Sequence, residues 1–531
     1  MATQAARPIS AWAPLRIAAF RALWIAVLVS NIGSWMQMVG AQWLLVGLPN
    51  AALLVSLVQT ADMLPDMLFE LVGGSLADTL DRRKLLITVQ ALLVVFGAAL
   101  TLLTLAGQMP PYLLLFFTFL IGTGSVIGLP AYQSLIPDIV PRAEIQAASA
   151  LGSMNINIAR AVGPAIAGLV IAQVGVPAVF ALNTLSFVFF LLVLVFWRPP
   201  PSARGGAPEP FVSAVRTGIR YVRYSSVVRR ILLRSAIFLL PASVLWALLP
   251  VVATQRMGQG AGAYGLMLGA LGIGAVAGAL LLPRARGRLT TDQLITIAST
   301  IYAAGLVTIV AIPSVAIALL VLLPVGAAWV AVLSDINAAM QLFLPAWVRA
   351  RGLSIYLMVL FGSQAVGALI WGLLAVPAGL VLTFVVAAAT LLAGAATTRI
   401  WPFPDTAGMD RSVVTPWPEP QLMVDIDPAD GPVVVQTTYT ISPERESHFL
   451  EAMEKVRRGR LRTGATQWGL FRDAEVPHRF VELFAVPSWD EHMRQHRDRL
   501  TLVEKEQEEE ANSLSDPEPV TEHLLAVDVP R

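Results

Sequence analysis

Three carboxylates recur at intervals of four residues within one long apolar stretch. If this stretch is an α-helix, Asp62, Asp66 and Glu70 lie on one face and drift by about 40° per step. A charge inside a bilayer costs roughly 2.5–3.5 kcal/mol, so each carboxylate must meet water, a partner or a proton. Because burial disfavours the charged form, such a group can bind and release a proton. This carboxylate stripe is our first candidate for proton chemistry. Alternatively, its members only face water or hold helices together.

Two other charged residues within the apolar stretches are candidates for a role in proton transfer. Arg160 follows two asparagines and could pair with Asp62 or Asp66, either to hold helices together or to take part in proton transfer. Asp335 comes late in a further stretch and is a second proton-binding candidate, although it could instead cap its helix at the membrane surface.

Amide and aromatic side chains are also spread through the apolar stretches. Asn31, Gln37, Trp246, Tyr356 and Gln364 are predicted to line a cavity with few fixed charges. Such a lining suits a large amphipathic or aromatic ligand. Tryptophan is also frequent as an anchor at the membrane interface, and that alternative stays open.

The composition indicates what kind of molecule positions these residues. Of 531 residues, 56% are apolar and only 14% are charged, which is typical of a polytopic helical membrane protein and not of a soluble enzyme. The chain has no cysteine, so disulfides and thiolate metal sites are excluded. All five histidines follow Gly431, so a proton carrier within the membrane must be a carboxylate.

Apolar runs long enough to span a bilayer predict twelve transmembrane helices in two bundles of six, followed by a soluble α+β domain. The runs cover 17–46, 51–76, 85–106, 112–135, 146–173, 177–197, 231–254, 263–283, 293–312, 314–340, 352–374 and 379–400. The predicted domains are a cytoplasmic tail 1–16, an N-terminal bundle 17–198, a basic cytoplasmic loop 199–230, a C-terminal bundle 231–401, a proline-rich linker 402–431 and a cytoplasmic domain 432–531. Arginines concentrate in loops after even-numbered helices, which places both termini in the cytoplasm.

The segment from Gly73 to Lys84 is expected to be a short charged turn between the second and third helices. Its Gly74, Asp78, Arg83 and Lys84, with Arg82 beside them, resemble the loop motif of the major facilitator superfamily, although Thr79 and Asp81 depart from it. The resemblance implies a latch in which a carboxylate faces basic side chains. The alternative is a generic basic loop on the cytoplasmic side.

The fifth predicted helix carries Gly163, Pro164 and Gly168. These residues resemble a motif of the superfamily's antiporters and exporters, but a simple small-residue packing face is the alternative. Over about 400 residues the pattern is similar to the branch of enterobactin-exporter-like proteins and drug:proton antiporters.

The last hundred residues read as a β-α-β-β-α-β unit, the order of a ferredoxin-like fold. Strands are predicted at 433–441, 465–472, 479–486 and 522–527, with helices from Ser442 to about Arg460 and from Ser488 through Glu510. The unit resembles antibiotic-biosynthesis-monooxygenase-like domains, which implies pairing into a homodimer. His492 and His496 stand four apart and raise the alternative of a metal site, but we expect a helix facing solvent or a dimer partner, and neither metal nor cofactor.

Together these features predict a secondary transporter of the bacterial inner membrane and not an enzyme. The resemblance implies proton-coupled efflux of a hydrophobic or amphipathic small molecule by alternating access. Its partners would be that substrate, protons and lipid, with no nucleic acid. An importer of the same fold, or a membrane-anchored enzyme acting through its C-terminal domain, are the alternatives. No nucleotide-binding loop occurs in the sequence, so ATP-driven transport is not supported.

Overall fold

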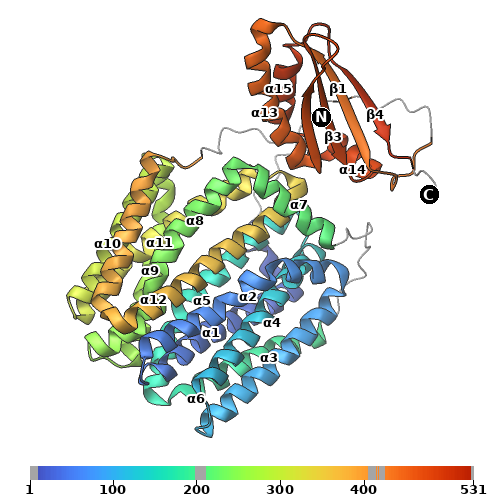
Figure 1. The fold of residues 1–531 in the computed structure, drawn as a ribbon. Coiled ribbons are helices and arrows are strands. Elements are labelled where there is room, and N and C mark those ends of the chain that lie inside the picture. Colours follow the sequence, from blue (N-terminus) through green and yellow to red (C-terminus); the bar gives the residue numbers. More distant parts are fainter. Residues whose placement is uncertain (1–9, 198–210, 405–413, 415–416, 418–424, 528–531) are drawn as a thin grey trace, which may run out of the picture. The chain divides into compact units, whose positions relative to one another are not determined.

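The computed structural model describes residues 10–197, 211–404, 414, 417 and 425–527. The N-terminal part forms six long helices packed side by side (Figure 1). Their bounds are α1 Ala18–Leu45, α2 Ala51–Thr79, α3 Arg82–Leu105, α4 Pro111–Ile139, α5 Ile145–Gln173 and α6 Val176–Phe196. Helices satisfy all their backbone hydrogen bonds internally, which is why apolar segments of this length adopt them in lipid.

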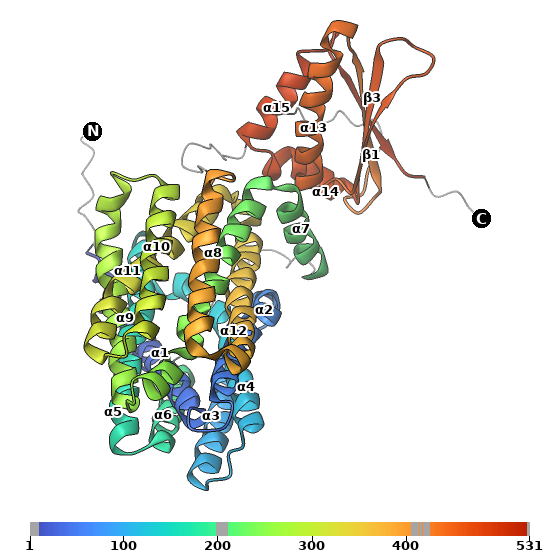
Figure 2. The same cartoon turned by 60° about the vertical axis from the view of Figure 1, so that its left-hand side comes forward.

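Six helices follow (Figure 2). They are α7 Phe211–Tyr224, α8 Ser226–Val251, α9 Ala261–Arg286, α10 Thr291–Ala311, α11 Val315–Phe343 and α12 Ala346–Ala396. Within the described residues, eleven helices are long and apolar enough to cross a membrane, and α7 is not among them.

The last of these helices is twice the usual length. α12 contains 51 residues, about 77 Å at 1.5 Å per residue, whereas the bilayer core is about 30 Å thick. At Gly379 the backbone leaves helical geometry, with φ 74° and ψ 167°, and this divides α12 into two helical segments. The sequence predicts a new run at the same residue.

Two predicted loops are more helical than expected. Gly73 to Asp78 belong to α2, so the turn before α3 is reduced to Leu80 and Asp81, and Asp81 accepts a hydrogen bond from the backbone N of Lys84 at 2.9 Å. The predicted loop 199–230 contains α7, whose arginines at 216, 220 and 223 recur at helical spacing.

The chain divides into two compact units. One comprises Met1–Pro208, Leu233–Ile336 and Leu357–Phe403, and thus holds most of the membrane-length helices. The other comprises Glu209–Leu232, Asn337–Tyr356 and Pro404–Arg531. It therefore joins the C-terminal region to α7 and to the adjoining ends of α11 and α12.

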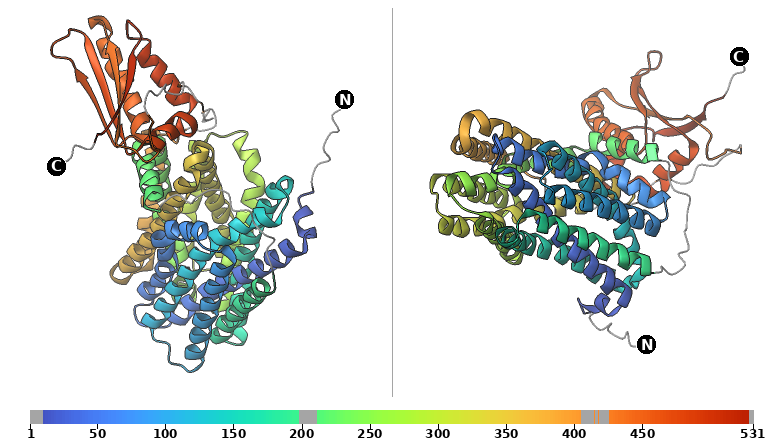
Figure 3. Two further views of the ribbon diagram at one scale, coloured as in Figure 1. Left: turned by 90° about the vertical axis from the view of Figure 1, so that its right-hand side faces the viewer. Right: turned by 90° about the horizontal axis from the view of Figure 1, so that it is seen from below.

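The C-terminal region contains a four-stranded antiparallel sheet, with α13 and α15 on one face (Figure 3). Its elements are β1 Val433–Thr440, α13 Glu446–Thr463, β2 Gln467–Arg472, β3 Arg479–Val486, α14 Trp489–Arg494, a π-helical turn Gln495–Arg499, α15 Leu502–Asn512 and β4 Val520–Leu525. The strand order is β2-β3-β1-β4. Alternate β1 side chains, such as Tyr439, are buried against Phe449 of α13 and Phe480 of β3.

Two details of this region differ from the prediction. The first helix does not begin at Ser442, because a 3-10 turn comes first and α13 begins at Glu446. The second helix does not run unbroken to Glu510, because Thr501 starts a new helix through a capping box with Glu504.

Candidate functional site

The carboxylate stripe lies on α2, which packs along α4. A Cβ on Gly122 of α4 would lie 3.1 Å from the carbonyl oxygen of Asp62, so the two backbones are close there. Glu70 is buried, while Asp62 and Asp66 are half-buried. Within the described ranges, the ion pairs of the long helices involve other carboxylates, and none includes a member of the stripe.

Among the described residues, Arg160 does not pair with Asp62 or Asp66, contrary to the sequence-based prediction. Its guanidinium carbon lies 5.7 Å from the centroid of the Trp35 ring, and its Nε is buried without a hydrogen-bond partner. The reason is the rotation of α5, because a Cβ on Gly163, one turn further on, would lie 2.6 Å from the Cβ of Trp35. Arg160 is therefore directed to α1 by the packing of its own helix.

The predicted lining residues on α1, Asn31 and Gln37, both hydrogen-bond to neighbouring helices. Asn31 donates to Asn155 of α5 at 2.9 Å, and Gln37 accepts from Asn183 of α6 at 2.5 Å. Both bonds join helices of the N-terminal half, so these amides hold that half together.

Trp246 belongs to a row of three tryptophans that spans both halves. Its ring centroid lies 6.0 Å from that of Trp35 on α1 and 5.6 Å from that of Trp329 on α11. We call Trp35, Trp246 and Trp329 the aromatic row, and Arg160 lies over its first member. The Nε1 of Trp246 is buried without a hydrogen-bond partner. Sequence reasoning predicts Trp246 as a lining residue but misses Trp329, which carries no local signal because aromatic residues are common in such helices.

The two remaining predicted lining residues are on α12. Gln364 is buried, and its amide donates to the carbonyl oxygen of Leu360 at 3.5 Å, a long contact within its own helix. Tyr356 is buried as well and belongs to the second compact unit.

Polar contacts near the end of α1 join the two halves. Gln42 donates to the carbonyl oxygen of Trp246 at 3.2 Å and accepts from the hydroxyl of Tyr264 on α9 at 2.5 Å. Trp43 stacks on the same tyrosine, with centroids 6.3 Å apart. Gln42 of α1 thus hydrogen-bonds to both α8 and α9.

Small residues bring helices of opposite halves into backbone contact. A Cβ on Gly168 of α5 would lie 2.7 Å from the carbonyl oxygen of Ala261 on α9, and one on Gly265 would lie 2.7 Å from that of Pro164. On α12, a Cβ on Gly372 would likewise clash with Ser56 of α2. Gly163, Pro164 and Gly168 thus form packing surfaces, and the halves are closed at the end where α1 stops and α2 starts.

The predicted latch motif is built around an arginine. Arg82 bonds Asp138 of α4 at 3.1 Å, and Arg83 donates to the carbonyl oxygens of Leu194 and Val195 at 3.1 and 2.8 Å. The side chain of Asp78 lies outside the described part of the structure. Lys84 contributes its backbone N to the cap of α3.

The close-packing glycine of this motif is Gly73 and not Gly74. A Cβ on Gly73 would lie 2.8 Å from the carbonyl oxygen of Val126, whereas nothing lies within 4 Å of one on Gly74. Because consecutive residues are about 100° apart around a helix, only one of the two can face α4.

The C-terminal half repeats the arginine pair. Arg286 follows Gly278 by eight residues, as Arg82 follows Gly74, and its Nε bonds Asp335 of α11 at 2.7 Å. Asp335 therefore forms an ion pair and does not cap its helix. Its Oδ2 is buried without a hydrogen-bond partner.

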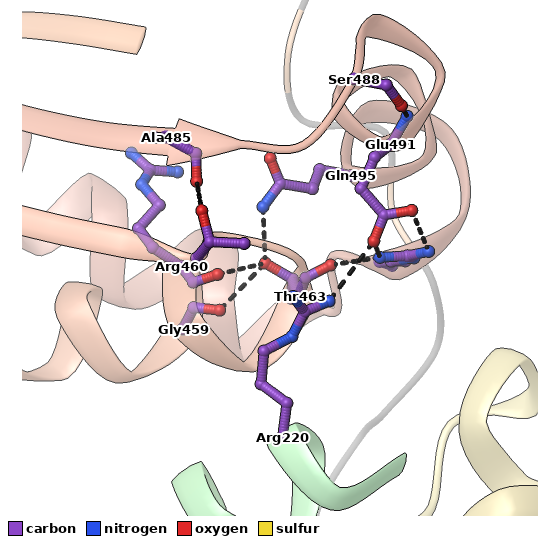
Figure 4. A network of polar contacts seen from close by, with 10 residues as sticks. Arg220, Gly459, Arg460, Thr463, Ala485, Ser488, Glu491 and Gln495 are labelled. Carbon is purple, nitrogen blue, oxygen red and sulfur yellow. Dashed lines mark hydrogen bonds and ion pairs between the residues drawn. The ribbon is translucent and has the colours of Figure 1, made fainter. Parts of the chain in front are cut away.

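The second unit contains an ion-pair cluster that joins α7 to the C-terminal region (Figure 4). Glu491 bonds Arg220 of α7 at 3.3 Å and Arg499 at 2.5 Å. Arg499 also donates to the carbonyl oxygen of Thr463 at 2.8 Å and lies 5.0 Å from the ring of Trp347, at the start of α12. We call Arg220, Glu491, Arg499 and Trp347 the tail clamp.

The expectation that His492 and His496 face solvent or a partner is wrong for this chain. They are 1% and 5% exposed, and His523 of β4 lies beside them. The sequence does not indicate that His523 joins the other two histidines, because it lies on a different element.

Comparisons with known proteins identify the family of the chain. The family model of the transmembrane secretion effectors matches residues 9–531. The staphyloferrin A transporter of Staphylococcus aureus is 23% identical over 48% of this chain and 64% of its own length. The multidrug efflux pump Tap of Mycolicibacterium fortuitum is 26% identical over 68% of this chain and 90% of its own. Macrolide efflux protein A of Streptococcus pyogenes is 22% identical over 44% and 58%. For the staphyloferrin A transporter and macrolide efflux protein A, the chain therefore covers less than two thirds of the relative's length.

Solved structures share the fold. A mutant form of the nucleoside transporter NupG superimposes with a TM-score of 0.61 at 10% identity, over 72% of this chain and 99% of that one. A D-xylose-proton symporter gives 0.59 at 13% identity, over 73% and 99%. Identities this low show the fold alone. The match of the family model over nearly the whole chain places it in the transmembrane secretion effector family, within the major facilitator superfamily of membrane transporters.

Proposed function

We propose that this protein is a proton-coupled exporter of a hydrophobic or amphipathic small molecule, working by alternating access. The aromatic row carries the proposal, since Trp35 and Trp329 from opposite halves both contact Trp246. Flat rings bind apolar and aromatic surfaces, and Trp246 adds one hydrogen-bond donor that no group of the described chain uses. The relatives are a staphyloferrin A transporter, a multidrug efflux pump and a macrolide efflux protein, and their functions support a substrate of this kind.

Proton coupling is assigned to the carboxylate stripe. Asp62 and Asp66 are half-buried on a helix that contacts both halves, and no cation neutralises them within the described residues. Movement of the halves then changes which carboxylate meets water and which holds a proton. A proton moving inward gains roughly 2.3 kcal/mol per 100 mV, enough to shift a two-state equilibrium about fiftyfold. Asp335 ranks second because Arg286 already neutralises it.

The proposed topology has twelve crossings of the bacterial inner membrane and cytoplasmic termini. The break at Gly379 supports two crossings by α12, and the arginines of alternate loops support the orientation. Reporter fusions after Pro208 and after Arg411 should both report cytoplasm, and a periplasmic signal from either would overturn the topology.

The C-terminal domain is proposed to be a ferredoxin-like regulatory module and not an enzyme. Its strand order β2-β3-β1-β4, all antiparallel, is that of two interleaved β-α-β units. The tail clamp joins this module to α7, which connects the two halves, and to the start of α12. The sheet face away from α13 carries exposed Phe471 and Leu524, which supports pairing into a homodimer.

Transport by the purified full chain in proteoliposomes tests the central proposal. With an imposed pH gradient, accumulation of a siderophore or a lipophilic cation should follow the gradient and collapse when a protonophore is added. Vesicles carrying Asp62→Asn/Asp66→Asn provide the matched control. Accumulation that ignores both the gradient and the double substitution would reject proton coupling. Substrate movement in the same direction as the protons would favour an importer.

A further inference from the structure

Three histidine side chains meet in the core of the C-terminal domain. One nitrogen from each of His492, His496 and His523 lies within 4.8 Å of the others. The Nε2 atoms of His492 and His496 are 3.1 Å apart. No other group of three potential ligands this compact occurs among the described residues.

The fold assembles this cluster from two elements. His492 belongs to α14 and His496 to the π-helical turn after it, so a spacing of four brings their ring centroids to 4.6 Å. His523 lies on β4 opposite Val435, whose side chain is buried under the helices, so His523 is on the same face. Its ring centroid is 4.8 Å from that of His492.

The hydrogen bond between His492 and His496 leaves the second ring nitrogen of His492 to be explained. Two facing Nε2 atoms can share only one proton, so one ring donates and the other accepts. His492 is then left with an Nδ1 that is buried and has no hydrogen-bond partner. His492 is only 1% exposed, and a buried polar atom without a hydrogen bond lowers the stability of the folded domain. The presence of such an atom therefore calls for an explanation.

Burial favours the neutral form of two of the three rings, His492 and His523. Burial lowers the pKa of His492 to about 3, and the neighbouring His496 and His523 contribute to this shift. Burial also lowers the pKa of His523. The charge of Arg460 also lowers the pKa of His492. Arg460 itself forms ion pairs with Glu482 at 3.2 Å and Glu508 at 2.7 Å. Neutral imidazole is the form that coordinates metals.

We propose that His492, His496 and His523 bind one divalent transition-metal ion of the zinc type. Zinc–nitrogen bonds of about 2.0–2.1 Å at tetrahedral angles place ligand nitrogens about 3.4 Å apart, close to the spacing of the first two. Imidazole ligands favour zinc, copper, nickel and iron over magnesium and calcium. Three protein ligands leave a fourth position for water or another ligand. A bound ion would join α14 to β4 and stabilise the folded domain.

The test uses the full chain in detergent, purified on a tag without histidine and stripped with EDTA. Titration with Co²⁺ should give the visible absorption of tetrahedral cobalt, saturating at one equivalent and lost when Zn²⁺ is added. His523→Gln, at a half-buried position, should weaken binding at least tenfold. His448→Gln, on the exposed face of α13, is the matched control and should bind like the wild type.

Two results would overturn the proposal. One is the absence of saturable cobalt absorption in the wild type, and the other is equal binding by the wild type and His523→Gln. Thermal unfolding guards against a misfolded variant, because Zn²⁺ should raise the Tm of the wild type and of His448→Gln but not that of His523→Gln. This outcome does not depend on transport, so the metal site and the proposed function can fail separately.

Discussion

Ala165 of α5 and Gly269 of α9 face each other across the two halves, and a Cβ on Gly269 would lie 3.7 Å from the Cβ of Ala165. That separation is close to the mean Cβ–Cβ distance of about 3.8 Å in disulfides. The natural chain has no cysteine, so a pair introduced here would have no competitor.

We therefore expect Ala165→Cys/Gly269→Cys to form a disulfide that locks the halves together at this end. Oxidation should abolish transport in proteoliposomes, and a reductant should restore it. Each single substitution serves as a control and should be insensitive to oxidant. Full transport by the quantitatively oxidised pair would show that α5 and α9 do not separate during the cycle.

Asp66→Asn is expected to abolish gradient-driven efflux while leaving substrate binding within about twofold of the wild type. Asparagine keeps the size of the side chain but cannot carry a proton, and binding does not require one. The measurement is transport against a pH gradient, paired with equilibrium binding in detergent. If Asp62→Asn, Asp66→Asn and the double variant all keep pH-dependent transport, α2 is not the proton path and Asp335 becomes the candidate.

Trp246→Phe should weaken substrate binding by about two- to tenfold, because it removes one hydrogen-bond donor worth about 0.5–1.5 kcal/mol and keeps an aromatic ring at the position. Trp371→Phe is the matched control, since the Trp371 Nε1 already donates to Leu240 within the protein at 2.7 Å. Titration calorimetry with a substrate identified in proteoliposomes gives both affinities. Equal affinity of the wild type and Trp246→Phe for the substrate would show that the Nε1 of Trp246 does not bind it.

Acidification should weaken the tail clamp. Burial alone would raise the pKa of Glu491, but Arg499 and Arg220 lower it below its usual 4.5 overall. A depressed carboxyl pKa stabilises the fold fully above the unfolded value, and this contribution is lost as pH falls through the lower folded value. Glu491→Gln should therefore lower Tm at neutral pH and lose this difference in strong acid.

Glu510→Gln is the control for the Tm measurements on Glu491→Gln. Glu510 pairs with Lys455 at an exposed site, where ion pairs contribute about 0–1 kcal/mol. Its Tm should stay near that of the wild type at every pH. Glu491→Gln and Glu510→Gln behaving alike would show that the clamp contributes little to stability.

Truncation after Phe403 should leave measurable but altered transport, because the carboxylate stripe and the aromatic row lie outside the removed domain. The removed domain, residues 432–531, is expected to fold alone and to dimerise, which sedimentation would show. A truncated chain that reaches the membrane intact but transports nothing would contradict a regulatory role for the domain.

The sequence predicts the long helices and the strands well, because hydropathy and alternation report directly on what each segment is buried against. Even the break at Gly379 coincides with a predicted boundary. Side-chain partners are predicted less well. Whether Arg160 meets an acid or Trp35 depends on the rotation of α5, and one residue turns a helix by about 100°. The same limit applies to Asn31 and Gln37, whose partners depend on how α1 is turned.

The third histidine and α7 illustrate a different limit. His523 joins His492 only after a whole sheet has formed, so no local spacing indicates it. The segment containing α7 is polar on one side and follows a proline-rich stretch, which favours reading it as a loop. As a helix, α7 is held by contacts with residues distant in the sequence, such as the ion pair between Arg220 and Glu491.

The aromatic row also gives the protein an optical signal of its own. Indole rings with centroids 5.6 and 6.0 Å apart couple their electronic transitions, and Trp35 and Trp246 belong to opposite halves. Rocking of the halves would change that coupling, so near-ultraviolet circular dichroism can follow the conformational cycle without an attached label. The rings proposed to contact the substrate would thereby report which way the transporter faces.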